Sequence, residues 1–90
     1  MEKVVITVTG RDKTGIVASI ATALAEYNVN ILDIRQSIME DLFTMIMLAD
    51  ISKSNKDFES LEKKLNEIGE KIGVKIIVQH ENIFKYMHRL

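Results

Sequence analysis

The 90-residue sequence contains no cysteine and no proline, and aromatic residues make up only 6% of it. Without cysteine, the chain has no disulfide framework, no thiolate nucleophile and no Cys-x-x-Cys metal motif. Its net charge of −1 provides no general attraction to the phosphate backbone of nucleic acids. No window approaches the roughly 18 apolar residues of a membrane span, and the N-terminus lacks the apolar core of a signal peptide. We therefore expect a cytoplasmic protein that binds neither nucleic acid nor membrane.

The composition is otherwise that of a folded domain, with 47% hydrophobic and 28% charged residues. Neither a linker nor an internal repeat interrupts the chain. We expect one domain over residues 1–80, followed by a helical tail over residues 81–90. A chain this short buries only roughly 60–70% of its unfolded surface, so a second copy is a natural source of additional core.

The first half alternates strand and helix patterns. A β-branched run predicts a strand over 4–9, the segment 10–15 reads as a turn with two glycines, and helical spacing follows from Ile16 to Tyr27. Asn28 is typical of a helix end, because asparagine tolerates the left-handed conformation. A second strand is expected over 31–39, with Leu32, Ile34 and Ile38 on one face and Asp33, Arg35 and Ser37 on the other.

The second half begins with a hairpin and ends with a helix and a strand. Glu40 and Asp41 form a tight turn into a third strand over 42–51, which requires antiparallel pairing. Residues 54–57 have the spacing of a capping box that starts at Ser54. An amphipathic helix then runs through 58–72, Gly73 is suited to its C-terminal cap, and residues 74–80 form a fourth strand.

This order predicts an α+β, ferredoxin-like βαββαβ sandwich. Its sheet has four antiparallel strands in the order 4-1-3-2, with both long helices on one face and a short helix at the C-terminus. The third strand is apolar on both faces, although two helices can cover only one side of the sheet. Either a second copy of the chain or the C-terminal tail must cover part of the other side, and we expect a homodimer.

The sequence carries no pattern of catalytic or metal-binding residues. His80 and His88 have no set of Ser, Asp or Glu residues around them, so we expect hydrogen-bonded or exposed side chains and neither metal nor cofactor. Asp33 and Arg35 share one strand face, where an ion pair or a dimer contact is favoured over acid–base catalysis. We therefore expect a protein without enzymatic activity.

The junction of the first strand and helix is the informative segment. Gly10 and Gly15 have the spacing of a P-loop, but Ile16 and Val17 replace the Lys and Ser/Thr that hold phosphates. The free N–H groups of the helix N-terminus favour an anion such as a carboxylate. Asp12 is suited to accept hydrogen bonds from an amine, so the loop fits an amino acid. The equal alternative is that Asp12 and Thr14 only cap the helix.

The stretch V-T-G-R-D-K-T-G-I-V-A, followed by Y-N-V-N-I-L-D-I-R-Q, resembles the ACT domain, a small regulatory module that binds amino acids. Asp12, Gly15 and Ile16 match its Asp/Asn-x-x-Gly-Ile/Val loop, and the run 29–31 matches the start of its second strand. The resemblance implies a ligand pocket between two subunits, with this loop as one wall and the second strand as the other. The residues it implies are Asp12, Lys13, Thr14, Gly15, Ile16, Asn30 and Gln36.

Two of these positions have a physical reading of their own. A side chain at Gly15 would crowd a ligand that approaches the backbone. Asn30 offers an acceptor and donors to a zwitterion, although it equally suits the turn at the start of a strand. Many ACT domains have proline where this chain has Thr14, which keeps the loop turn but removes its rigidity.

The resemblance thus implies a dimeric, allosteric sensor of a small molecule, an amino acid, that acts on an unidentified protein in trans. The alternative is a protein-interaction module without a small ligand. In that case the tail, where Ile83, Met87 and Leu90 share a helical face beside Phe84, clasps a partner or seals the dimer.

Overall fold

The computed structural model describes residues 1–11 and 14–87. The elements are β1 (Lys3–Arg11), α1 (Ile16–Glu26), β2 (Asn30–Met39), β3 (Leu42–Asp50), α2 (Phe58–Ile72), β4 (Lys75–His80) and α3 (Glu81–Met87). Their succession is βαββαβ with a short helix after the last strand, which confirms the predicted fold class.

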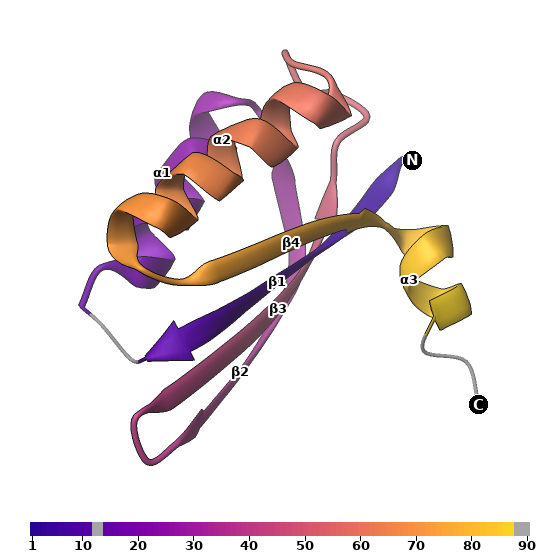
Figure 1. The fold of residues 1–90 in the computed structure, drawn as a ribbon. Coiled ribbons are helices and arrows are strands. Elements are labelled where there is room, and N and C mark those ends of the chain that lie inside the picture. Colours follow the sequence, from indigo (N-terminus) through magenta and orange to yellow (C-terminus); the bar gives the residue numbers. More distant parts are fainter. Residues whose placement is uncertain (12–13, 88–90) are drawn as a thin grey trace.

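The four strands form one antiparallel sheet in the order β2-β3-β1-β4. The order 4-1-3-2 is the same arrangement counted from the other edge. Helices α1 and α2 lie together over one face of this sheet, while α3 turns away at the end of β4 (Figure 1). The prediction of two layers with both long helices on one side is therefore confirmed.

The hydrophobic core fills the space between the sheet and the two long helices. Alternate residues of each central strand face this core. On β1 these residues are Val4, Ile6 and Val8, and their side chains are completely buried. The opposing side chains from the helices are also almost completely buried: Ile16, Ile20, Leu24, Leu61 and Leu65. Each such side chain contributes about 1.5–3 kcal/mol through burial, so this layer supplies most of the stability.

Strand β1 is longer than the predicted strand over 4–9. Its pairing with β3 continues to Arg11 and Leu42, so Gly10 lies inside the strand and not in a turn. The predicted turn over 10–15 was therefore wrong at its start. The β-branched run marks only the part of β1 that is buried, whereas backbone pairing extends to the exposed Arg11.

Strand β2 contains a bulge that the alternating pattern did not predict. The register with β3 shifts between Ile31 and Asp33, so Leu32 has no directly paired residue and is 38% exposed. Ile31 packs against the core together with Ile34. The expected alternation, with Leu32 on the same face as Ile34, was wrong here, because the extra residue changes the alternation at this point.

Helix α2 runs over Phe58–Ile72 as predicted, but its N-cap lies three residues after Ser54, the start of the predicted capping box. Its N-cap is Asp57, whose side chain accepts a hydrogen bond of 2.8 Å from the Ser60 N–H. Bonds from the Ser60 hydroxyl and N–H lower the pKa of Asp57. The Ser54 hydroxyl bonds to the backbone of Lys56, so the assignment of Ser54 as the cap was wrong. Gly73 ends the helix with a φ of 83°, as predicted.

Within residues 1–11 and 14–87, none of the helices combines the length and the apolar character needed to cross a bilayer.

Candidate functional site

The N-terminus of α1 presents backbone donors. Gly15 is the N-cap residue, no side-chain cap hydrogen bond is found among residues 1–11 and 14–87, and the first turn contains no acidic residue. Thr14 is exposed, whereas the Ile16 side chain is buried in the core, so Ile16 can offer a ligand only its backbone. These first N–H groups and the positive end of the helix dipole favour an anion here.

The structure bears on one part of the capping alternative for this loop. Gly15, and not Thr14, occupies the N-cap position of α1. Asp12 and Lys13 lie outside the described residues. Their part in the predicted site remains a prediction.

The backbone conformation explains the glycine at position 15. Its φ of 88° lies in the left-handed region, where a side chain is strained, and a Cβ atom there would meet nothing within 4 Å. Crowding by the described residues is therefore not the reason for this glycine. Its conformation is what turns the loop into the first turn of α1.

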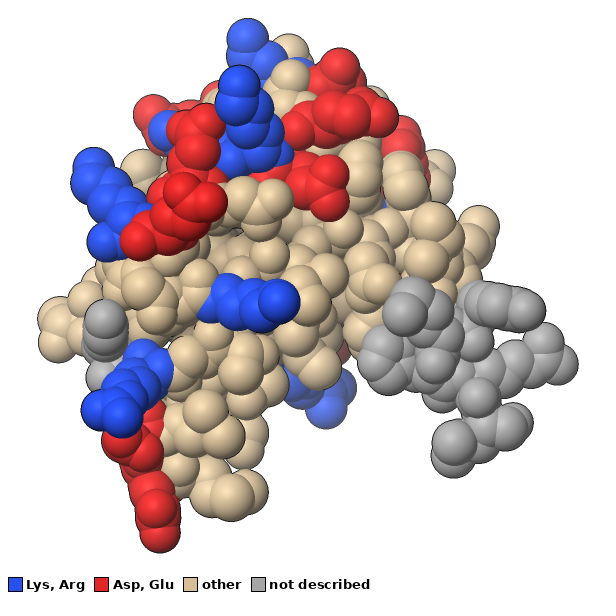
Figure 2. All heavy atoms as spheres, viewed as in Figure 1, with Lys and Arg blue, Asp and Glu red and all other residues tan. Residues whose placement is uncertain are grey.

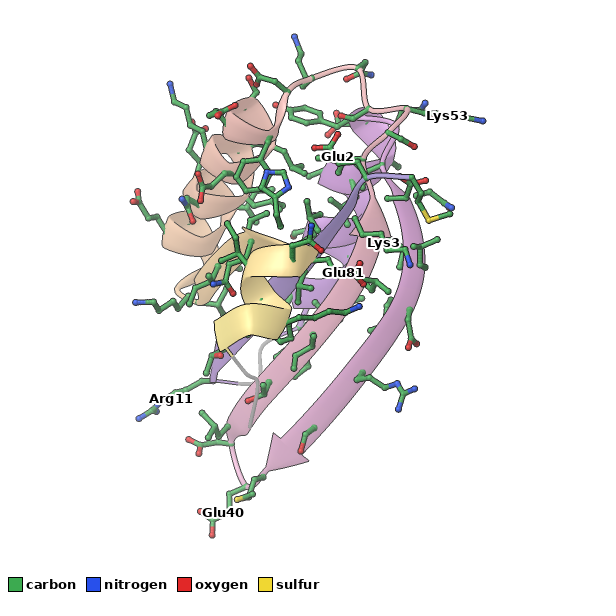
Figure 3. The ribbon with its side chains drawn as sticks, turned by 90° about the vertical axis from the view of Figure 1, so that its right-hand side faces the viewer. Glu2, Lys3, Arg11, Glu40, Lys53 and Glu81 are labelled. Atoms are coloured by element: carbon green, nitrogen blue, oxygen red, sulfur yellow. The ribbon has the colours of Figure 1, made fainter. Side chains whose placement is uncertain are left out.

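Asn30 lies at the opposite end of the sheet from Gly15. It begins β2 and pairs with Asp50 at the end of β3, which in turn pairs with Lys3 at the start of β1. Gly15 follows the end of β1, and the 11-residue helix α1 separates the two ends by about 16 Å. Figure 3 shows Lys53 at the end near Asn30, and Arg11 and Glu40 toward the other.

Asn30 lines a hollow of about 300 Å³ together with Asn28, Val29, Asp50 and Lys53. The Asp50 carboxylate accepts hydrogen bonds from the N–H groups of Ser52, at 2.9 Å, and Glu2, at 3.3 Å. Bonds from Ser52 are the main reason that the pKa of Asp50 is lowered, which keeps this carboxylate charged. The hollow is therefore lined by two asparagines, an acidic residue and a lysine.

The sequence analysis did not include Asp50 and Lys53 in the site. They are 20 and 23 residues beyond Asn30 and reach it only through the pairing of β2 with β3. If β2 and β3 paired without a bulge from the turn at Glu40 and Asp41 onward, Asn30 would pair with Ile51. The bulge after Ile31 moves the pairing by one residue, to Asp50.

Gln36 belongs to the other end of β2. It pairs with Met45, on the sheet side that faces the helices, and its side chain is exposed. It lies six residues beyond Asn30, or roughly 20 Å along the strand. Within one chain, the described candidate residues thus form two groups: Thr14, Gly15, Ile16 and Gln36 toward one end of the sheet, and Asn30 at the other.

The other groups that the sequence analysis singled out have structural partners where the structure describes them, and His88 lies outside the described residues. The His80 ring stacks on Phe58 with a centroid distance of 4.2 Å, and its Nδ1 atom lies 3.9 Å from a carboxylate oxygen of Glu2. Asp33 and Arg35 form an exposed ion pair at 3.4 Å. In the described part of the chain, no three His, Asp or Glu side chains gather as a metal site would require.

Charge is distributed unevenly over the surface in Figure 2. Basic and acidic side chains gather side by side over the helical layer, at the top of the view. Below it, most of the surface of the strands is uncharged apart from a few side chains. This view contains no extended surface of one sign of charge.

Comparison with known proteins identifies a matching family and similar full-length relatives. A family model described as the ACT domain matches residues 2–79. A UPF0237 protein of Methanococcus maripaludis is 66% identical over 90 residues, and one of Methanocaldococcus jannaschii is 60% identical; both alignments cover 100% of each chain.

Solved structures agree with these sequence relatives. An ACT domain protein from Streptococcus pneumoniae has a TM-score of 0.80 and 38% identity, over 93% of this chain and 94% of that chain. A candidate glycine cleavage system transcriptional repressor has a TM-score of 0.77 and 26% identity, over 88% of this chain and 45% of that chain.

Proposed function

Because this chain belongs to the ACT domain family, we propose that it is a regulatory protein that binds an amino acid between two copies of itself. The observation that carries this proposal is the separation of the candidate residues. The N-terminus of α1 and Asn30 lie at opposite ends of one sheet, so a single chain cannot close both walls around one small molecule.

A two-fold axis beside β2 would bring the two walls together. β2 is an edge strand of ten residues, so its outer side is open to antiparallel pairing with β2 of a second copy. Antiparallel pairing places the start of one β2 beside the end of the other. Asn30 of the partner subunit then arrives at the end of the sheet where Gly15 lies, and symmetry creates two equal sites.

Apolar side chains beside the β2 edge also favour association with a second copy. Val17 of α1 and Ile31 and Ile34 of β2 are only partly buried at the margin of the core. Ile38, farther along β2, is 57% exposed. A copy that pairs along β2 would shield these apolar side chains from water, which favours association.

The chemistry of the combined site fits an amino acid. The free N–H groups at the start of α1 would bind its carboxylate, with Lys13 and Thr14 beside them. Asp12 would accept hydrogen bonds from its ammonium group, and Asn30 and Gln36 would each add an acceptor and two donors. Gly15 and Ile16 would contribute their backbone. A zwitterion needs both kinds of contact within one small site.

The response would be allosteric, because a ligand held by two copies stabilises one arrangement of the dimer over others. A second protein would recognise that arrangement, and the chain itself would catalyse no reaction. Similarity to a candidate transcriptional repressor supports a regulatory role of this kind.

Thermal unfolding in the presence of each of the twenty amino acids tests this proposal. A ligand at about 100 times its Kd stabilises by about 2.7 kcal/mol, which raises the Tm by more than about 10 °C in a domain of this size. Asn30→Ala should abolish the rise for that amino acid. Asn66→Ala, which changes an exposed asparagine of α2, should retain it.

Mixing two inactive variants tests whether the site spans two chains. Asp12→Ala removes a group from one wall and Asn30→Ala removes one from the other, so a mixed dimer contains one intact site and one doubly defective site. Random exchange of subunits should restore binding at about one site in four. Restoration of none would contradict a site built from two chains.

The exposed side chain of Ile83 on α3, at 53%, supports the alternative of a protein-interaction module without a small ligand. The predicted tail face also includes Met87 and Leu90; Leu90 lies outside the described residues, as does the side chain of Met87. A panel of amino acids that leaves the Tm unchanged would favour this alternative, and Ile83→Glu should then weaken binding of the partner.

A further inference from the structure

The side of α1 that faces away from α2 lies beside β2. Ser19, Ala23 and Glu26 of α1 line a hollow together with residues of α2, so they mark the side of α1 that is turned toward α2. Val17 and Ala21 each lie two positions from Ser19, or about 200° around the helix, and both are half-buried. Because α2 contacts β4 and α1 contacts β2, these two side chains face β2.

Strand β2 leaves part of its helix-facing side uncovered at the end near Gly15. Three of its residues point to this side, because they pair with buried core residues of β3: Ile34, Gln36 and Ile38. Ile34 is partly buried beside the core, whereas Gln36 is exposed and Ile38 is 57% exposed. The surface that Val17 of α1 forms with these three residues of β2 is here called the ledge.

The ledge carries no charged side chain. The two charged residues of β2, Asp33 and Arg35, lie on the other face of the sheet and form an ion pair with each other at 3.4 Å. At the hairpin end of the sheet, Arg11 and Asp41 are 3.8 Å apart, and Figure 3 shows Glu40 at the outer tip of the hairpin. A ligand side chain on the ledge would therefore meet aliphatic groups and one amide.

The start of α1 determines which part of a bound amino acid reaches the ledge. In the proposed site, the carboxylate of the ligand binds the free N–H groups of the first turn of α1, which includes Val17. Cβ atoms of a helix lean toward its N-terminus, so the Val17 side chain leans toward the bound molecule. Ile38 lies at the end of β2 beside which the second copy would begin its own β2. The ligand side chain would thus be enclosed between the ledge and the second copy.

We propose that the ledge selects an amino acid with an aliphatic side chain, such as valine, leucine or isoleucine. The inference rests on the proposed function, because the ledge is part of the same site. Contact with Val17 and Ile38 removes apolar surface of the ligand and of the protein from water, which favours binding. A charged ligand side chain would lose its hydration there and find no opposite charge on the ledge, which opposes binding.

Calorimetric titration with pairs of amino acids of similar shape tests this selection. Valine and threonine differ by the exchange of a methyl group for a hydroxyl, and leucine and asparagine by the exchange of two methyl groups for an amide. The aliphatic member of at least one pair should bind about 10 to 100 times more tightly than its polar counterpart.

Ile38→Ala should reduce that preference, because it removes most of an aliphatic side chain from the ledge. Each buried CH₂ changes Kd about fourfold, so the Kd of the aliphatic ligand should rise about tenfold and that of its polar counterpart should rise less. A variant that only weakened the dimer would raise both Kd values equally and keep their ratio. Ile77→Ala is the matched control, since Ile77 is 42% exposed on the opposite sheet face, and it should leave both Kd values unchanged.

The outcomes keep this inference apart from the proposed function. If the amino acid that binds most tightly is polar or charged, and Asn30→Ala abolishes its binding, the proposed function stands and the aliphatic selection is refuted. If Ile38→Ala folds, as judged by a cooperative thermal transition, and keeps the wild-type ratio of Kd values, selection by the ledge is refuted. If none of the twenty amino acids binds, the proposed function fails and this inference fails with it.

Discussion

The Cγ1 atom of Val74 lies 2.7 Å from the position that a Cβ atom on Gly10 would occupy. Gly10 stands inside β1, opposite Phe43, so the missing side chain allows the segment between α2 and β4 to pass close to the sheet. Gly69 has a similar relation to the same residue, because its Cβ position lies 2.7 Å from the Val74 carbonyl oxygen. Val74 is thus enclosed by two glycines, one on the sheet and one on α2.

Gly10→Ala should therefore lower the free energy of unfolding by about 1–3 kcal/mol, because its methyl group overlaps Val74. Urea denaturation measures this change. Val74→Ala removes the nearest atom, so the double variant should lose less than the sum of the two single effects. Full additivity would show that the contact with Val74 is not the cause.

Glu40→Gly should increase stability by about 0.5 kcal/mol. Glu40 has a φ of 58° in the two-residue turn between β2 and β3, where glycine avoids a strain of about 1–2 kcal/mol but loses more chain entropy. Asp41→Gly, at the next turn position, lacks a positive φ to relieve and should decrease stability. Thermal unfolding of both variants gives the comparison, and a loss of stability in Glu40→Gly would contradict it.

Asp57→Ala should lower the Tm by a few degrees at neutral pH, since α2 loses its N-cap bond to Ser60. The pKa of Asp57 is lowered in the folded chain, so this stabilisation is present above the ordinary pKa of 3.8 and is lost as the pH falls through the folded value. The difference in Tm between wild type and Asp57→Ala should consequently shrink on acidification.

Asp57→Asn provides the control for that pH dependence. Asparagine is also a good N-cap but cannot titrate in this range, so its Tm should stay near that of the wild type at pH 7. Below pH 3.8 it should lose less stability than the wild type does. Equal acid sensitivity of the two proteins would show that Asp57 is not the responsible group.

Phe58→Leu should lower stability by about 1 kcal/mol, because leucine retains part of the core contact but not the stacking on His80. A double-mutant cycle with His80→Ala, measured by urea denaturation, isolates the ring contact. A coupling energy near zero would mean that the two rings do not stabilise one another.

Most of the fold could be predicted because local patterns and short connections agree. The spacing of Leu61 and Leu65 predicts the buried side of α2, and the two-residue turn at Glu40 determines how β2 and β3 pair. The bulge at Leu32 could not be predicted, since either alternation of apolar residues is compatible with a strand. Asp57 was overlooked as a cap because Ser54 offers a similar side chain three residues earlier.

The candidate site was predictable only in its local parts. The glycine N-cap of α1 follows from the residues around Gly15, which are adjacent in sequence. The distance between Gly15 and Asn30 depends on the path of α1 across the sheet, and the approach of Asp50 to Asn30 depends on the bulge. These relations arise from pairing between segments that are distant in sequence. The residues of either segment alone do not determine that pairing.

The short length of β4 has a consequence for how far these chains can assemble. Pairing through β2 would leave β4 as the outer strand at each side of the joined sheet, and β4 has only six residues. It begins with the exposed Lys75 and gives way at Glu81 to α3, so it offers an incoming strand little backbone and a charge at its start. Further strand addition at β4 would thus be disfavoured, which would limit growth of such a dimer into fibrils.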